Sequence, residues 1–131
     1  MRVLTACAVA AICAAPVASQ EALSEYLWEK RPIIIFADSE EDLLFRRQME
    51  LLDEETAELE ECDVVVLTDT DPDTISELRK ELRPRGFQLV LLGKDGDVKL
   101  RKPRPWTVRE LSRVIDKMPM RQQEIRQRWK R

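Results

Sequence analysis

Three short apolar runs limit how this chain can fold more than any other feature of the sequence. They lie in residues 33–36, 63–68 and 87–93, with the sequences IIIF, DVVVLT and FQLVLLG. Continuous apolar runs of this length, without polar residues at alternate positions, are typical of strands that are buried on both faces. The chain therefore needs helices on both sides of a sheet, which is the layered arrangement of an α/β domain.

Helical patterns of apolar residues precede, separate and follow these runs. In the first connection Asp38 or Ser39 can cap a helix, and Asp42 follows Ser39 by three residues, as in a capping box. Thr107 and Glu110 repeat that signal before the last helix. The expected helices cover residues 21–30, 39–61, 71–82 and 107–118, and the third of them starts where Asp71 precedes Pro72.

A hairpin completes the sheet. Asp95 and Gly96 predict a tight turn after the third run, and residues 98–101 return as a fourth strand antiparallel to the third. Two strand–helix–strand crossovers, this hairpin and a covering helix give the order β-α-β-α-β-β-α. We therefore predict a thioredoxin-like, three-layer α/β/α fold with a mixed four-stranded sheet, and we expect Trp28 to pack as a lid over the sheet edge.

The first 19 residues have the pattern of a secretory signal peptide. Arg2 supplies a positive start, an uncharged apolar or small stretch follows, and small residues surround a cleavage point after Ser19. A lipoprotein site at Cys7 is the rival interpretation, although only six residues precede it. We predict an exported protein of the periplasm or the extracellular space, with no transmembrane segment because the apolar run is too short.

The remaining chain is expected to be one domain, residues 20–119, followed by a basic tail, residues 120–131. The tail is predicted to be disordered or weakly helical and dispensable for folding, since only Ile125 and Trp129, four residues apart, are apolar enough to dock on the domain. A weak contact with a membrane surface, with Trp129 as the anchor, is a further interpretation that Glu124 and the two glutamines weaken.

Several kinds of chemistry find no support in the sequence. The chain has no histidine, and Cys62 is the one cysteine after residue 19. In thioredoxin-like enzymes the reactive cysteine lies in the loop after the first strand, but here that loop, residues 37–42, is ADSEED. The place of the cis-proline of those enzymes falls at Phe87 or Gln88, and the nearest proline is Pro84. We expect no redox centre, and we expect Cys62 to be a small buried residue.

Metals, cofactors and nucleic acids are not indicated either. Asp69, Asp71 and Asp73 imitate the start of a calcium loop, yet the sixth place holds Thr74 rather than glycine and the twelfth holds Lys80 rather than glutamate. We therefore expect no metal and no cofactor. The 22 basic and 25 acidic residues give a net charge of −3, which provides no reason to expect binding to nucleic acid.

Three stretches carry a resemblance to a known family. They are WEKRP at residues 28–32 with Phe36-Ala37, LVLLGKDGDVKLR at residues 89–101, and IDKMPMRQQE at residues 115–124. They resemble the bacterial exported domain-of-unknown-function family 4174 (DUF4174), and a related domain recurs in a vertebrate extracellular protein. The resemblance implies a thioredoxin- or peroxiredoxin-like domain without an established activity. This sequence departs from it in a longer acidic run at residues 39–42, a shorter connection before the third strand and a Gly86-Phe87 entry to that strand.

The leading functional prediction is a non-redox, exported thioredoxin-like domain that acts as a binding or interaction module of the cell envelope, with an unknown protein as partner. Candidate ligand-binding residues are Asp38, Ser39, Lys94, Asp95, Lys99 and Arg101. No catalytic set is recognisable, and an enzyme is the less favoured reading. The alternative is an envelope enzyme of peroxiredoxin ancestry that uses polar residues of the first strand–helix loop. It requires Asp38 to lie in a concave pocket that favours its protonated form.

Overall fold

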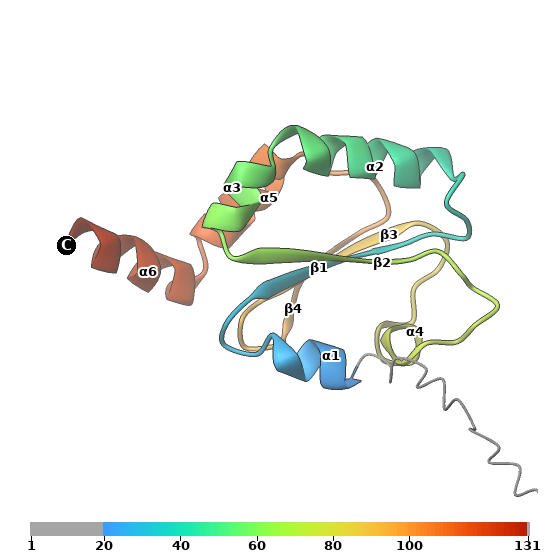
Figure 1. The fold of residues 1–131 in the computed structure, drawn as a ribbon, viewed down its shortest axis with the longest axis horizontal. Helices are drawn as coiled ribbons and strands as arrows, with labels where there is room; N and C mark the ends of the chain where they lie inside the picture. Colours follow the sequence, from blue (N-terminus) through green and yellow to red (C-terminus); the bar gives the residue numbers. More distant parts are fainter. Residues whose placement is uncertain (1–19, 131) are drawn as a thin grey trace, which may run out of the picture.

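A four-stranded mixed sheet forms the centre of the molecule (Figure 1). The computed structural model describes residues 20–130, and the predicted signal peptide lies outside this part of the chain. Helices α2, α3 and α5 cover one face of the sheet, and α1 and α4 cover the other. The elements are α1 (Gln20–Glu25), β1 (Arg31–Phe36), α2 (Leu43–Glu54), α3 (Thr56–Glu61), β2 (Val64–Asp69), α4 (Glu77–Leu82), β3 (Gln88–Leu92), β4 (Val98–Lys102), α5 (Val108–Asp116) and α6 (Pro119–Trp129).

The strand order β2-β1-β3-β4 confirms the predicted fold class. Strand β1 pairs parallel with β2, from Arg31 opposite Val64 to Phe36 opposite Asp69. Strand β3 runs antiparallel to both β1 and β4. The connection from β1 to β2 is therefore a parallel crossover, as predicted. The connection from β2 to β3 was also expected to be a crossover, but β3 runs in the opposite direction.

The apolar run of β1 supplies side chains to two separate cores. Ile33 and Ile35 pack with Leu111 and Ile115 of α5, whereas Ile34 and Phe36 pack on the other face with Leu82 of α4. Successive side chains of a strand point to opposite faces, so a continuous apolar sequence is what a central, doubly covered strand requires. Strand β2 lies at the sheet edge and is only partly buried, which corrects the prediction of a second fully buried strand.

The long helix predicted over residues 39–61 is two helices. Asp42 is the N-cap of α2, and one of its carboxylate oxygens accepts from the backbone N–H groups of Leu44 and Phe45. Neither Asp38 nor Ser39 therefore caps this helix. Glu55 has non-helical angles, φ −136° and ψ 50°, and separates α2 from α3. The bend lets Leu52 and Leu59 enter the same core cluster.

The helix expected from Asp71 starts at Glu77 instead. The Asp71 carboxylate accepts from the backbone N–H groups of Asp73 and Thr74 and holds a local turn, and Ser76 is the N-cap that accepts from Arg79 N–H. Short acidic side chains compete with helix formation by bonding nearby backbone groups. The predicted cap, Asp71, was therefore wrong, and the helix begins five residues later behind a serine cap.

Two local predictions are confirmed and one is wrong. The Thr107–Glu110 capping box is present, and Gly96 takes the positive φ, 84°, that its turn requires. Trp28, expected to be a lid, is 64% exposed and has a positive φ of 67°. Its backbone N–H donates to the Lys94 carbonyl at 2.7 Å, so this residue joins the segment before β1 to the hairpin through its backbone rather than its ring.

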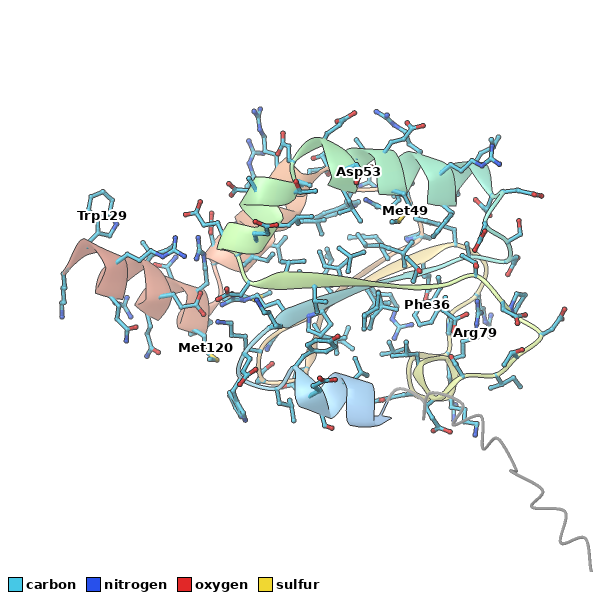
Figure 2. The ribbon with its side chains drawn as sticks, in the orientation of Figure 1. Phe36, Met49, Asp53, Arg79, Met120 and Trp129 are labelled. Carbon is cyan, nitrogen blue, oxygen red and sulfur yellow. The ribbon has the colours of Figure 1, made fainter. Side chains whose placement is uncertain are left out.

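The C-terminal segment is a helix, α6, rather than a disordered or weakly helical tail. Pro119 lies in the first turn of α6, where a backbone N–H has no partner within the helix and its loss in proline costs nothing. The helix projects away from the sheet (Figure 1). Trp129, one of the two residues considered apolar enough to dock, is 85% exposed at the far end (Figure 2). The side chains that attach α6 to the domain include Arg121, which is buried, Glu124 and Arg128.

Candidate functional site

The carboxyl end of β1 is where the sequence placed its first candidate residues. Asp38 and Ser39 are exposed there, and Ser39 Oγ accepts from Glu41 N–H at 3.0 Å. This is a local turn that leads the chain to the Asp42 cap. Asp38 lines none of the hollows described below, so the concave setting that the enzyme alternative requires is not supported by the geometry.

A buried ion pair lies close to this turn, between β2 and α4. Arg79 Nε donates to Asp69 Oδ1 at 2.9 Å, and Arg79 Nη2 donates to the carbonyl of Ala37 at 3.0 Å. Ser76 Oγ donates to the other Asp69 oxygen at 2.6 Å, and the guanidinium carbon of Arg79 lies 5.4 Å from the centre of the Phe36 ring (Figure 2). These contacts tie the ends of β1 and β2 to the start of α4, and the polar groups already satisfy one another.

The opposite end of the sheet, where β1 begins and the β3–β4 turn lies, holds a second cluster of charges; we call it the hairpin end. Arg31 is 0% exposed, and its two terminal nitrogens donate to the two carboxylate oxygens of Glu124 at 3.3 and 3.1 Å. Lys94 Nζ donates to Glu124 Oε1 at 2.5 Å and to Asp63 Oδ2 at 2.9 Å. One carboxylate of α6 thus bridges two buried cations from β1 and the hairpin turn.

These partners change how Glu124 titrates. Burial alone would raise its pKa, but the hydrogen bonds from Lys94 and Arg31 outweigh burial and lower it below the ordinary value. Next to it, Arg121 of α6 donates to Asp116 Oδ1 at 3.2 Å and to the Glu61 carbonyl at 3.3 Å. Glu124 therefore stays ionised at neutral pH and belongs to a network that joins α6 to the body of the domain.

Three hollows open at the hairpin end. One of about 200 Å³ lies between α1 and the hairpin and is lined mainly by apolar groups, among them Leu23, Tyr26 and Leu92. Another, of about 150 Å³, is lined by Arg31, Lys94, Asp95, Lys99 and the first residues of α6. The third, bordered by Asp63, Glu124, Gln127 and Arg128, lies beside the same carboxylate. A further hollow, bordered by Leu51 and Thr107, lies between α2 and α5.

Cys62 lies directly before β2 and is 1% exposed, as predicted. Burial raises the pKa of its thiol above the ordinary value, and this effect exceeds that of the nearby Arg121. Its backbone carbonyl accepts from Arg31 Nη1 at 2.8 Å, so the residue supports the cluster at the hairpin end through its main chain. A buried thiol with a raised pKa is a poor nucleophile.

The structure divides the six predicted site residues between the two ends of the sheet. Lys94, Asp95 and Lys99 gather at the hairpin end, where Lys99 Nζ donates to Asp95 Oδ2 at 2.9 Å and lowers the pKa of Asp95. Arg101 lies elsewhere on β4 and donates to the Leu82 carbonyl at 2.6 Å and to Gln88 at 3.0 Å. Asp38 and Ser39 stay apart from all four, and no single site contains the predicted set.

Sequence reasoning missed the residues that form the two buried clusters: Arg31, Glu124, Arg121, Asp69 and Arg79. A signal was present for the first three, because each lies in one of the stretches that carry the family resemblance. Those stretches, far apart in the chain, meet at the hairpin end. In residues 20–130 no group of three or more Cys, Asp or Glu side chains could hold a metal ion, and no helix of that part is long and apolar enough to cross a membrane.

Comparison with known proteins agrees with the fold. A family model described as "Domain of unknown function (DUF4174)" matches residues 22–124. A crystal structure of reduced Plasmodium vivax 2-Cys peroxiredoxin is similar, with a TM-score of 0.59, 14% identity, and coverage of 72% of this chain and 80% of the other. A structure of Plasmodium yoelii Prx1a, which forms an artifactual octamer when modified at the N-terminus, gives a TM-score of 0.56, 16% identity, and coverage of 72% of this chain and 76% of the other. At these identities the likeness concerns the fold.

Proposed function

The chain belongs to the DUF4174 family, and on that premise we propose that it is an exported, non-redox thioredoxin-like domain that acts as a binding module of the cell envelope. The observation that carries the proposal concerns the cysteine side chains that redox chemistry would need. Cys62 is buried, its thiol pKa is raised, and the loop after β1 contains no cysteine. A dithiol cycle needs two thiols within reach, and a one-cysteine peroxidase needs an accessible thiolate.

The binding surface that we propose is the hairpin end. The segment before β1 and the hairpin turn are held together there by the bond from Trp28 N–H to the Lys94 carbonyl. A Cβ built on Gly96 would lie 2.9 Å from Leu27 Cδ2, so the turn packs closely on this segment, and the positive φ of Gly96 favours glycine there. Leu27, which lines the largely apolar hollow, and Trp28, the next residue in the chain, remain exposed. Aromatic side chains are enriched in protein-binding surfaces.

Thiol reactivity tests the non-redox part. We expect slow labelling of native Cys62 at neutral pH, and peroxide consumption equal to that of Cys62→Ala. Labelling after unfolding in urea is the control that the thiol is intact. Fast native labelling, together with peroxide turnover that disappears in Cys62→Ala, would overturn the proposal in favour of the enzyme alternative.

Variant-dependent capture tests the binding part. Chains carrying Trp28→Ala or Trp129→Ala are used beside the parent chain to capture protein from an envelope extract. We expect one defined partner to be lost with Trp28→Ala and retained with Trp129→Ala, because the second tryptophan lies at the far end of α6. A partner that ignores Trp28→Ala would remove the hairpin end from the proposal. Recovery of a chain that starts at Gln20 from the envelope fraction tests export.

A weak membrane contact of α6 is a second candidate, and one observation favours it. Glu124, which weakened this interpretation in the sequence, is turned toward Arg31 and Lys94, and the exposed end of α6 carries Arg126, Trp129 and Lys130. Basic residues beside a tryptophan suit an anionic lipid surface. Binding to vesicles with anionic lipid that falls with salt and with Trp129→Ala would support this contact. Equal binding by the variant would refute it.

A further inference from the structure

Arg31 and Lys94 are arranged around Glu124 as a receptor is arranged around its ligand. They come from the start of β1 and from the hairpin turn, two segments that β1–β3 pairing brings side by side. Arg31 presents both terminal nitrogens to the two oxygens of one carboxylate, which is the forked geometry that suits arginine to carboxylates, and Lys94 adds a third donor to the same group.

The body of the domain supplies only part of the negative charge that these two cations require. Asp63 pairs with Lys94 and not with Arg31, and the remaining bond of the Arg31 terminal nitrogens goes to the neutral carbonyl of Cys62. Arg31 Nε is buried and has no hydrogen-bond partner in the described part of the chain. A buried guanidinium without a carboxylate is costly, so this place calls for an anion.

Helix α6 delivers that anion and is attached mainly by polar contacts. Its residues Arg121, Glu124 and Arg128 follow one another at steps of three and four, which places them on the same side of the helix, and each makes an ion pair with the body. Pro119 favours the extended conformation of Met118, ψ 138°, and thereby turns α6 toward the cations. The first residues of α6 also form one wall of the 150 Å³ hollow that Arg31 and Lys94 line.

We propose that Arg31 and Lys94 form a carboxylate-binding site that α6 fills with Glu124, and that an acidic segment of a partner protein takes this place when α6 moves away. Helix α6 is then an internal ligand that blocks the site. The proposal rests on the proposed binding function, whose surface it extends, and gives the partner a chemistry: glutamate or aspartate side chains rather than a phosphate or a lipid. The fork of Arg31 matches two carboxylate oxygens, and Lys94 already holds the third contact.

Chemical rescue tests the receptor. Glu124→Ala empties the site, and we expect acetate to raise the melting temperature of this full-length variant by several degrees more than chloride at equal ionic strength. The parent chain and the matched control Glu60→Ala, which removes an exposed glutamate of α3, should respond equally to both salts. If Glu124→Ala does not fold, Glu124→Ser, which also removes the carboxylate and leaves space for acetate, serves in its place. Equal responses of the variant and the control would overturn the proposal.

Peptide binding tests the ligand class. We expect fluorescein-labelled hexaglutamate to bind Glu124→Ala about tenfold more tightly than the parent chain, and Lys94→Met in the same chain to remove the gain. Hexaglutamine should bind none of the variants. Equal hexaglutamate affinity with and without Lys94 would show a nonspecific charge effect and refute the site. Capture that depends on Trp28 without acetate rescue would leave the proposed function standing and refute only this inference.

Discussion

Both ends of the sheet are closed by largely buried ion pairs, but the two pairs differ in how far apart their residues lie along the chain. At the carboxyl end, Asp69 and Arg79 are ten residues apart and pair where β2 leads into α4. At the hairpin end, Arg31 and Glu124 are 93 residues apart, and nearly the whole domain lies between them. The first pair belongs to one supersecondary unit, and the second joins the first strand to the last helix.

This difference indicates separate roles for the two clusters. The Asp69–Arg79 pair, with the bond from Arg79 to the Ala37 carbonyl, fixes the loop end at which thioredoxin-like enzymes place their reactive group. The Arg31–Glu124–Lys94 cluster instead governs whether a terminal element is docked. We therefore expect the carboxyl end to behave as a structural joint and the hairpin end as the place where the molecule can change.

Replacement of the buried arginine at the hairpin end should have the largest effect. Arg31→Met should lower the free energy of unfolding by about 4 kcal/mol, because it removes one partner of a buried pair and the bond to the Cys62 carbonyl. Urea unfolding measures the loss, and limited proteolysis should find new cleavage in α6. The control Arg47→Met breaks an exposed pair with Glu50 and should cost less than about 0.5 kcal/mol. Similar losses for both variants would mean that burial of Arg31 contributes nothing.

The matching change at the carboxyl end should be smaller and local. Arg79→Met should cost about 3 kcal/mol, since Asp69 keeps the bond from Ser76 but loses its cation. Proteolysis of α6 should be unchanged, because no contact connects this pair to that helix in the described structure. New cleavage in α6 of Arg79→Met would show that the two ends are coupled, contrary to the separation of roles.

Removal of α6 provides a third test. A chain that ends at Pro119 loses Glu124 and Arg121 together, and we expect it to be less stable by more than about 2 kcal/mol, although water then reaches Arg31 and limits the cost. The sequence alone favoured the opposite result, a dispensable tail. Thermal unfolding within a few degrees of the parent chain would support that earlier expectation and would show that α6 adds little to stability.

The smallest expected effect is that of Glu124→Gln, which tests the charge of a single side chain. Glu124→Gln keeps the shape of the side chain and should cost about 1 kcal/mol at neutral pH. Because the folded pKa of Glu124 is lowered, its ionised form stabilises the fold above the unfolded pKa of about 4.3, and this contribution is lost as the pH falls through the folded pKa. The unfolding free energies of the two chains should therefore converge as the pH falls below about 4.3 and through the folded pKa of Glu124. A constant difference across that range would mean that the charge of Glu124 is not what holds α6.

Local signals in the sequence predicted much of the fold. The doubly buried β1, the Asp95-Gly96 turn and the Thr107–Glu110 capping box depend on residues within a few positions of one another, and the structure contains all three. Errors arose where two local options compete. The Asp71 carboxylate could cap a helix or hold a turn, and the turn is the one formed, because Ser76 offers a cap that leads α4 to bury Leu82.

The candidate site was less predictable for a physical reason. Of the proposed residues, Lys94 alone belongs to the buried cluster at the hairpin end, and the sequence treated it as part of a solvated hairpin. The sequence did not predict a docked helix α6, because hydrophobic periodicity detects helices that dock through apolar stripes, and this helix docks through ion pairs of Arg121 and Glu124. A charged residue looks the same in sequence whether it faces water or a buried partner.

The sequence by itself determined the succession of the four strands, the doubly covered central strand and the absence of a second cysteine after residue 19, because these follow from periodicity, turn chemistry and composition. Tertiary structure alone decided which charges are buried and which partner each one meets. Strand β1 brings Arg31, the hairpin turn brings Lys94, and the last helix brings Glu124, so their common place exists only after the sheet has formed and the start of α6 has attached to its hairpin end. Burial and partner choice depend on distances in space, and separation along the chain carries almost no information about them.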